Sequence, residues 1–132
     1  MEPIVVVAAV VKRDGKVLAC RRAPHKSLGG YWEFPGGKVD PGETDDIALA
    51  REMLEELNVQ ISVNEFIEKS IAPAGDLTIE LRGYWATMAE NDISSSTDHD
   101  EFRWVSSAEI EGLNWAPADL PIVTEVKRVL SA

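Results

Sequence analysis

Cysteine is nearly absent from this sequence. Cys20 is the only cysteine among 132 residues, so the chain cannot form an internal disulfide. Proteins of a reducing compartment commonly have this composition, and we therefore expect a cytoplasmic protein. Cys20 itself lies in an apolar run, where the simplest interpretation is a small buried residue of a strand.

Long apolar runs are equally scarce. The most hydrophobic stretch, PIVVVAAVV at residues 3–11, is far shorter than the roughly 20 residues that a membrane-spanning helix needs. No basic segment precedes it and valine dominates it, which favours a buried strand over a signal peptide. The sequence has no internal repeat or linker, and we expect one globular domain that covers residues 1–132.

Basic residues are much fewer than acidic residues. The chain has 13 Lys and Arg against 23 Asp and Glu, which gives a net charge of −10 at pH 7. A nucleic-acid-binding protein is expected to carry a basic stripe, and long-range repulsion disfavours both a polymeric nucleic acid and an anionic membrane as partners. A small anion that arrives with divalent cations is not excluded, so the charge leaves a small-molecule partner open.

Apolar periodicity and turn signals predict an α/β fold, in which helices flank a mixed sheet. Residues 4–12 form a β-branched run typical of a strand covered on both faces, and Asp-Gly in RDGK indicates a hairpin into a strand at 16–22. We expect the remaining strands at 31–34, near 60–70 and 77–89, and at 101–105. We expect helices at about 44–58, 106–113 and 121–130, and loops at 23–30, 35–44 and 94–101.

The predicted helix at 44–58 carries three glutamates, Glu52, Glu55 and Glu56, within five positions. Like charges three or four positions apart on a helix repel by about 0.2–0.5 kcal/mol per pair, and no basic residue stands four positions after any of the three to offset this. The helical period predicts that the glutamates lie opposite a buried stripe, which consists of Ile47, Ala50, Leu54 and Leu57.

The surroundings of these glutamates favour a metal site over a solvated acidic face. The segment before the helix, PGGKVDPGET at 35–44, is rich in glycine and can approach a ligand closely. Carboxylates that converge with a backbone carbonyl suit hard divalent cations such as Mg²⁺, which often bridge protein carboxylates and substrate phosphates. A bound cation would also neutralise the repulsion between the glutamates.

Residues 37–59, GKVDPGETDDIALAREMLEELNV, resemble the Nudix box, G-x5-E-x7-R-E-U-x-E-E-x-G-U, in which U is a bulky aliphatic residue. The one departure is Asn58 in place of the last glycine, and Asn is the next most favourable residue at a left-handed helix C-cap. The resemblance implies a Nudix-like α/β/α sandwich and a hydrolase. Eight positions are in register: Gly37, Glu43, Arg51, Glu52, Met53, Glu55, Glu56 and Val59.

The resemblance also implies roles for the box residues. Arg51, a residue of the family's catalytic site, would pair with Glu43 and hold the loop against the helix, and Gly37 would be a structural position. Lys38 would lie near the substrate phosphates, although an exposed loop lysine is the simpler alternative. Mg²⁺, with Mn²⁺ as the alternative ion, would be ligated by the side chains of Glu52, Glu55 and Glu56 and by the backbone carbonyl of Gly36.

The reaction implied by the resemblance is attack of water on a phosphorus of a nucleoside diphosphate linked to another group. In the MutT-like branch, an acid six residues before a tryptophan accepts the proton. Here the tryptophan is Trp104 and the acid is Asp98, one methylene shorter than the glutamate more common in the family. Glu56 and Glu101 remain alternative bases. The next residue, His99, is interpreted as a loop histidine.

Three further segments, VVVAAVVKRDGKVLACRR, GGYWEFPGGK and WAPADLP, resemble the MutT and CTP-pyrophosphohydrolase subgroup. In this subgroup a side chain at the position of Asp119 reads the edge of the base. An ionised Asp only accepts hydrogen bonds, whereas a buried, protonated Asp also donates. The alternative is that Asp119 caps the last helix. Phe34, Trp32 and Trp115 are candidates either for stacking on the base or for the core. The other nucleotide contacts implied are Arg22, Glu33, Phe34, Pro35 and Lys38.

The resulting hypothesis is a Mg²⁺-dependent hydrolase that converts a nucleoside triphosphate to the monophosphate and pyrophosphate. Its substrates would be 8-oxo-dGTP or a (modified) dCTP or CTP, and it would act as a monomer or a homodimer. One alternative is a pyrophosphatase of a nucleotide sugar or dinucleotide. Another is a non-catalytic nucleotide sensor, although such a protein would be expected to have lost box acids that this chain retains.

Overall fold

A mixed sheet forms the centre of the computed structural model, which describes residues 2–89, 93 and 96–132. Within these residues the strand order is β3-β2-β1-β6-β5, and β4 pairs with β1 while β7 pairs with β2. The strands are β1 (Ile4–Arg13), β2 (Lys16–Arg22), β3 (Trp32–Glu33), β4 (Gly36–Lys38), β5 (Ile61–Ala74), β6 (Leu77–Met88) and β7 (His99–Val105). The helices are α1 (Asp45–Leu57), α2 (Ser107–Ile110), the 3-10 turn η1 (Pro117–Asp119) and α3 (Leu120–Leu130).

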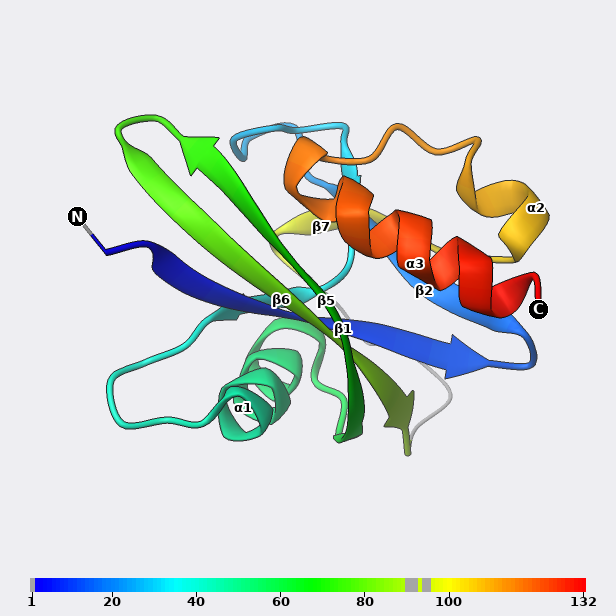
Figure 1. Cartoon of the computed structure of the whole chain (residues 1–132), viewed down its shortest axis with the longest axis horizontal. Helices are drawn as coiled ribbons and strands as arrows, with labels where there is room; N and C mark the ends of the chain where they lie inside the picture. Colours follow the sequence, from blue (N-terminus) through cyan, green and yellow to red (C-terminus); the bar gives the residue numbers. More distant parts are fainter. Residues whose placement is uncertain (1, 90–92, 94–95) are drawn as a thin grey trace.

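Helices cover both faces of this sheet (Figure 1). α1 lies on one face, and α2 and α3 lie on the other. Strand β1 runs between two apolar cores, because Ala8 and Val10 belong to the core under α3, whereas Val7, Ala9 and Val11 belong to the core over α1. The predicted α/β/α sandwich and the prediction that the first strand is buried on both faces are therefore confirmed.

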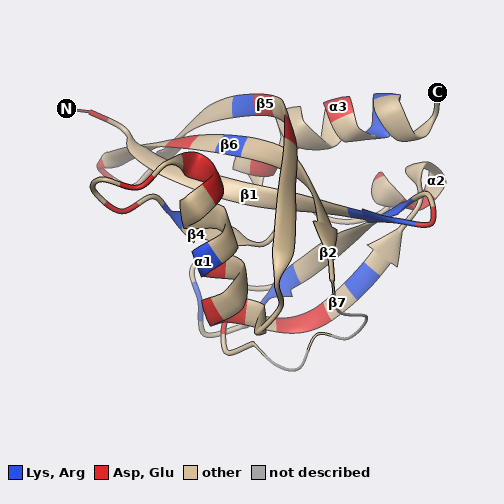
Figure 2. Ribbon diagram, turned by 90° about the horizontal axis from the view of Figure 1, so that it is seen from below, with Lys and Arg blue, Asp and Glu red and all other residues tan. Residues whose placement is uncertain are grey.

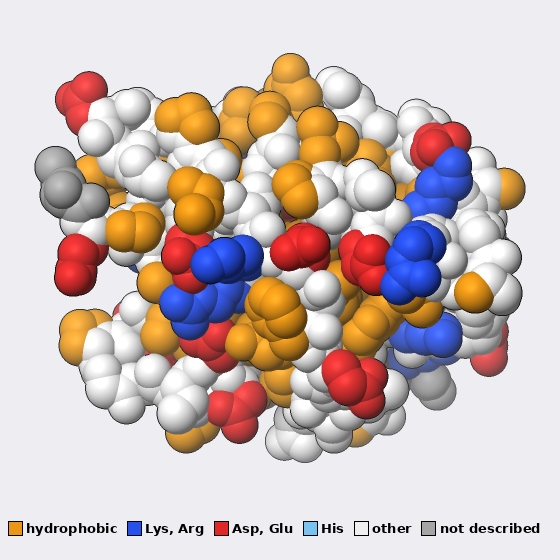
Figure 3. Space-filling model, in the orientation of Figure 1, with side chains coloured by type: hydrophobic (Ala, Val, Ile, Leu, Met, Phe, Trp, Pro, Cys, Tyr) orange, Lys and Arg blue, Asp and Glu red, His pale blue; other side chains and the backbone are white. Residues whose placement is uncertain are grey.

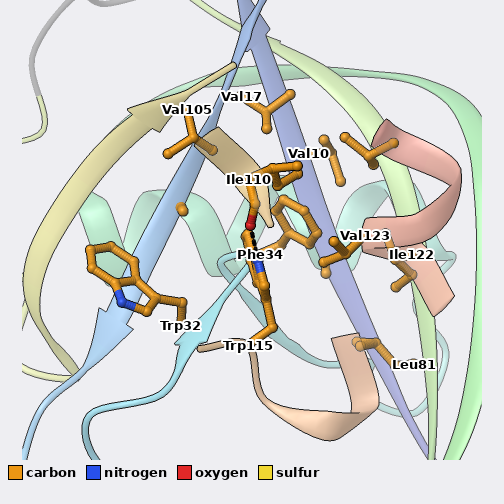
Figure 4. Packing of buried hydrophobic residues seen from close by; sticks show 13 residues of the cluster. Val10, Val17, Trp32, Phe34, Leu81, Val105, Ile110, Trp115, Ile122 and Val123 are labelled. Carbon is orange, nitrogen blue, oxygen red and sulfur yellow. Dashed lines mark hydrogen bonds between the residues drawn. The ribbon is translucent and has the colours of Figure 1, made fainter. Parts of the chain in front are cut away.

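The core under α3 is rich in aromatic side chains (Figure 4). The ring centroids of Phe34 and Trp115 lie 4.7 Å apart, and Nε1 of Trp115 donates to the carbonyl of Ile110 at 2.8 Å. No helix in the described part of the chain has both the length and the apolar character needed to span a membrane.

The structure confirms the predicted turn between β1 and β2 and the predicted left-handed end of α1. Asp14 and Gly15 both have positive φ, 52° and 77°, as the two-residue turn between β1 and β2 requires. Asn58 ends α1 in the left-handed region at φ 55° and ψ 40°, and its N–H donates to the carbonyl of Leu54. The chain thus keeps the turn that the box glycine would otherwise provide.

Some predicted element boundaries are wrong. The segment 35–44 was predicted as a loop, but it contains β4, which pairs with β1 through Gly36 and Ala8. The two strands approach so closely that a Cβ on Gly36 would lie 1.9 Å from the carbonyl oxygen of Val7. Glycines needed for this approach resemble turn signals, which is why the strand was missed. Strand β7 also begins at His99, two residues before its predicted start.

The predicted buried stripe of α1 is confirmed at Leu57 and wrong at Ile47 and Leu54. Ile47 and Leu54 are 57% and 49% exposed. The buried residues of the helix are Ala48, Leu49, Met53 and Leu57. Residues four apart share a helix face, so Glu52 and Glu56 follow Ala48 along the edge of the buried stripe and do not lie opposite to it. Their side chains are 17% and 19% exposed, against 57% for Glu55.

Candidate active site

Arg51 joins the segment before α1 to the helix itself. Its Nε and Nη2 each lie 2.8 Å from an oxygen of Glu43, which forms a two-pronged ion pair. Nη2 also donates to the backbone carbonyl of Lys38 at 3.0 Å. The hydrogen bonds from Arg51 are the main reason why the pKa of Glu43 falls to about 2. The loop and the helix are thus held by an ionised pair at every ordinary pH.

The same guanidinium contacts two of the predicted metal ligands. Nη1 of Arg51 lies 2.8 Å from Glu52 and 3.2 Å from Glu55. Arg51 stands four positions before Glu55, so a basic residue on the N-terminal side of the glutamates offsets part of their repulsion. The expectation that no basic residue does so counted only the positions that follow each glutamate. The described residues contain no group of three His, Cys, Asp or Glu side chains arranged to hold a metal ion.

Nevertheless, all three predicted carboxylate ligands line one cavity of about 220 Å³. Its walls are Glu52, Glu55, Glu56, Ser96 and Thr97. Figure 2 shows the acidic segments of α1 close to the acidic start of β7. Burial, and next the neighbouring carboxylate of Asp98, raise the pKa of Glu56 well above its ordinary value. Arg51 thus offsets the charge of Glu52 and Glu55, whereas Glu56 is favoured in its protonated form. The hard oxygen donors fit a divalent cation such as Mg²⁺ once Arg51 releases Glu52 and Glu55.

The three candidate bases differ in their surroundings. The Asp98 carboxylate accepts a hydrogen bond from Glu56, which holds the pKa of Asp98 below its usual range. Its Oδ1 also lies 3.0 Å from Nζ of Lys26, a residue that the sequence analysis did not single out. Glu101 instead pairs with Arg21 at 3.3 Å and with a second arginine of its own strand. Asp98 and Glu56 therefore lie together, and Glu101 is engaged elsewhere.

A second cavity, of about 360 Å³, contains most of the predicted nucleotide contacts. Asp119 is buried in its wall, and its Oδ2 accepts the N–H of Phe34 at 2.9 Å. Burial raises the pKa of Asp119 to about 8. Asp119 stands at the N-cap of α3 but makes no side-chain capping bond, so the interpretation as a helix cap is wrong. The predicted contacts that line this cavity are Arg22, Glu33, Phe34, Lys38 and Asp119.

Three other candidates lie outside this lining. The carbonyl of Pro35 accepts the N–H of Ala9 at 2.8 Å and so belongs to the backbone pairing with β1. Trp32 and Trp115 are buried in the core under α3. Of the aromatic residues considered for stacking on a base, only Phe34 both lines the cavity and packs in the core.

Strand β4 brings the two cavities together. Gly36, Gly37 and Lys38 line the larger cavity. On its other side Gly37 lies directly against Glu52, because a Cβ on Gly37 would be 2.0 Å from Oε2 of that residue. The wall of the larger cavity and the carboxylate of Glu52, which lines the smaller one, are therefore in direct contact at β4.

His99, predicted as a loop histidine, is a buried residue of β7. Its Nε2 lies 2.8 Å from Oε2 of Glu33, and its Nδ1 lies 3.1 Å from Oγ of Ser96. Local sequence patterns gave no sign of this arrangement, because Glu33 is 66 positions away.

Comparisons with known proteins agree with the observed fold. The family model described as a NUDIX domain matches residues 1–126. The chain is 35% identical over 123 residues to the CTP pyrophosphohydrolase of Escherichia coli strain K12, and the alignment covers 93% of this chain and 90% of the relative. It is 25% identical over 125 residues to the 8-oxo-dGTP diphosphatase of the same strain, and that alignment covers 95% of this chain and 96% of the relative. The crystal structure of the MutT protein from Methanosarcina mazei Go1 has the same fold, with a TM-score of 0.86 at 24% identity over 99% of this chain and 98% of that chain.

Proposed function

The chain belongs to the Nudix hydrolase family, and from that premise we propose that it converts a nucleoside triphosphate and water to the monophosphate and pyrophosphate. The observation that carries this proposal is the pair of cavities that adjoin across β4. One has the size and the mixed apolar and polar lining of a nucleoside site. The other presents the carboxylates of α1 where the phosphates would follow.

A divalent cation is part of this proposal, as it is generally for the family. Mg²⁺, or Mn²⁺ as the alternative, would be held by Glu52, Glu55, Glu56 and the backbone carbonyl of Gly36. When bound, such an ion neutralises charge on the phosphates and lowers the barrier to attack by water. Arg51 would give up its contacts with Glu52 and Glu55 but keep the pair with Glu43 that holds the loop.

Asp98 is the proposed proton acceptor. The water oxygen forms a bond to phosphorus, the phosphoanhydride bond on the opposite side breaks, and pyrophosphate leaves with the bonding electrons. The proton of the water passes to the carboxylate of Asp98, which adjoins Glu56 at the cavity of the metal ligands. Glu56 remains the alternative acceptor, while the ion pairs of Glu101 speak against that residue.

Asp119 and Phe34 are proposed to read the base. The apolar ring supplies a surface for stacking, and the carboxyl group supplies polar recognition. Because Oδ2 already accepts the N–H of Phe34, Oδ1 remains for the base edge. The names of the two relatives point to CTP and to 8-oxo-dGTP. We therefore propose 8-oxo-dGTP and (modified) dCTP or CTP as the substrate classes.

We expect the base preference to depend on pH through Asp119. Its pKa of about 8 means that Oδ1 donates a proton below that pH and only accepts above it. In the wild type, the ratio of kcat/KM for dCTP to that for dGTP should change between about pH 6 and pH 9. The ratio cancels pH effects on the chemical step that both substrates share.

The matched variant for this test is Asp119→Asn, which donates and accepts at every pH and keeps an oxygen for the N–H of Phe34. Its ratio should be constant over the same range. The raised pKa also means that wild-type stability falls as pH rises from about 4 to 8, because only the folded state then holds the proton. The variant should lose the part of this slope that Asp119 contributes in thermal unfolding and keep the part that comes from the raised pKa of Glu56. Parallel pH profiles for the two proteins would refute the assignment.

The proposed reaction is tested by incubating the protein with Mg²⁺ and 8-oxo-dGTP, dGTP, CTP, dCTP, 5-methyl-dCTP, ADP-ribose or diadenosine polyphosphate. We expect one triphosphate to be converted to monophosphate and pyrophosphate much faster than the others, as resolved by ion exchange. Addition of EDTA should stop the reaction. Release of inorganic phosphate alone, or no product from any compound by the folded protein, would reject the proposal.

One observation favours a second candidate, a pyrophosphatase of a nucleoside diphosphate linked to another group. A further cavity of about 620 Å³ is mostly apolar and shares Leu28, Ile79 and Ala118 with the nucleoside cavity. It could receive the second half of such a substrate. Turnover of ADP-ribose or the dinucleotide in place of every triphosphate would establish this alternative.

The surface charge supports a small-molecule partner. On the face in Figure 3 the basic side chains lie beside acidic ones. Ion pairs such as Arg82–Asp45 and Arg128–Glu125 show the same mixing of charge. An extended basic stripe of the kind that binds nucleic acid is not seen on that face. We therefore propose a cytoplasmic enzyme that acts on free nucleotides, as a monomer or homodimer, without polymeric nucleic acid or membrane partners.

A further inference from the structure

His99 stands between the two cavities of the candidate site. Its Nε2 contacts Glu33, which lines the nucleoside cavity, at 2.8 Å. Its Nδ1 contacts Oγ of Ser96, which lines the cavity of the metal ligands, at 3.1 Å. The imidazole is 2% exposed, so bulk water does not compete for either contact. One rigid ring thus joins the two halves of the site.

The neighbours of Ser96 determine which imidazole nitrogen carries the proton. Oγ of Ser96 accepts the backbone N–H groups of Asp98 and His99, each at 3.2 Å. A hydroxyl oxygen has two lone pairs, so both are used, and its single hydrogen is left for Nδ1 of His99. Nδ1 therefore accepts, and Nε2 carries the proton that it donates to the carboxylate of Glu33.

The network continues beyond the imidazole in both directions. Nη1 of Arg22 lies 3.2 Å from each oxygen of Glu33, so this carboxylate is held from two sides. At the other end, the bond from Asp98 N–H to Ser96 fixes the backbone that carries the proposed proton acceptor. Nδ1 of His99 also lies 3.9 Å from Oε2 of Glu56.

We propose that His99 is a positioning residue that couples nucleotide binding to the catalytic carboxylates, an inference that rests on the proposed function. Through Nε2 it holds Glu33 in the orientation that the nucleotide meets. Through Nδ1 and Ser96 it holds the segment that keeps Asp98 beside Glu56. A histidine that only filled space would not need polar partners in both cavities, whereas these two contacts require a ring with a nitrogen on each side.

The kinetic test uses three variants that separate the two nitrogens. Asn places its amide near the position of Nδ1, so His99→Asn should keep the contact with Ser96 and lose the one with Glu33, which raises KM. Gln reaches the position of Nε2, so His99→Gln should keep Glu33 and lose Ser96, which lowers kcat. His99→Leu should lose both, with a fall in kcat/KM of about 10- to 100-fold, as is usual for residues that orient catalytic ligands.

The matched control is His25→Gln, because His25 is the only other histidine of the chain and is exposed. It should leave kcat and KM unchanged. The proposal is overturned if His99→Leu turns over like the wild type. It is also overturned if the Asn and Gln variants change kcat and KM in the same way and in proportion to a fall in melting temperature. A purely structural role would have that effect.

A spectroscopic test does not depend on turnover. In the ¹⁵N-labelled protein, the imidazole signals of His99 should show a protonated Nε2 and an unprotonated Nδ1 at neutral pH. Addition of a nucleoside monophosphate should shift the Nε2 signal in the wild type and not in Glu33→Gln. A proton on Nδ1, or no response to a monophosphate that binds, would overturn the inference. A wild type without turnover that still gives these signals would reject only the proposed reaction.

Discussion

Replacement of Glu56 by glutamine is expected to lower kcat by about 100- to 10,000-fold, the rate equivalent of the several kcal/mol that a bound cation supplies. Glutamine keeps the volume of the side chain but removes the charge that a hard cation needs. Fold stability should not fall, because burial already disfavours the ionised form of Glu56 and glutamine resembles the protonated form. Glu52→Gln should lose as much activity, but it also gives up an ion pair with Arg51 at 2.8 Å.

The measurement combines Mg²⁺-dependent turnover with thermal unfolding and Mn²⁺ binding by calorimetry. Glu65→Gln is the matched control, because Glu65 is an exposed carboxylate on β5, outside both cavities of the candidate site. It should match the wild type in all three measurements. If Glu56→Gln kept near wild-type turnover, the proposed metal site would be wrong. If it lost turnover but bound Mn²⁺ normally, Glu56 would act as the base and not as a ligand.

The central elements of the fold were predictable because their signals are local. The apolar run of β1, the Asp-Gly turn and the period of α1 each specify a structure within a few residues. The face of α1 was not predictable in this way. Ile47 and Leu54 are more apolar than Ala48 and Met53. Nevertheless, Ile47 and Leu54 are exposed, whereas Ala48 and Met53 are buried. Periodicity alone cannot choose between two stripes one residue apart.

What sets the face of α1 is the rest of the site. Arg51 ties the helix to Glu43 and to the backbone of β4, and Glu52 lies against Gly37. These contacts turn Glu52 toward the sheet and leave Ile47 and Leu54 outside. A functional site that departs from the apolar pattern in this way is expected to cause an error in sequence-based reasoning.

The sequence predicted which residues belong to the candidate site better than it predicted the contacts that they make. A motif with fixed spacing identified the glutamates of α1 as candidates, because helical neighbours can be counted along the chain. The partners of His99 could not be found in this way. Glu33 and His99 come from different strands, β3 and β7, which both pair with β2. Only the order of strands in the sheet brings them together.

Alanine at the adjacent glycines Gly36 and Gly37 is expected to lower activity at both positions but stability only at Gly36. At Gly36 the new Cβ would meet backbone, 1.9 Å from the carbonyl oxygen of Val7 and 2.9 Å from Cα of Ala8. Strand β4 must then move away from β1. Overpacking of this kind costs about 1–3 kcal/mol, so Gly36→Ala should lower the melting temperature by roughly 10 °C and lose activity with the strand pairing.

At Gly37 the three nearest atoms to the new Cβ would all belong to the side chain of Glu52, with Oε2 at 2.0 Å. That carboxylate can rotate away, so Gly37→Ala should unfold near the wild-type temperature. The displaced Glu52 is a proposed metal ligand, however, and kcat should fall by about 10- to 100-fold. Gly112→Ala is the control, since its Cβ would lie 3.3 Å from the carbonyl of Glu109, far from both cavities. Full activity in Gly37→Ala would mean that catalysis does not require the carboxylate of Glu52 in its observed position. An equal loss of stability at both positions would mean that Gly37, like Gly36, serves the strand and not the site.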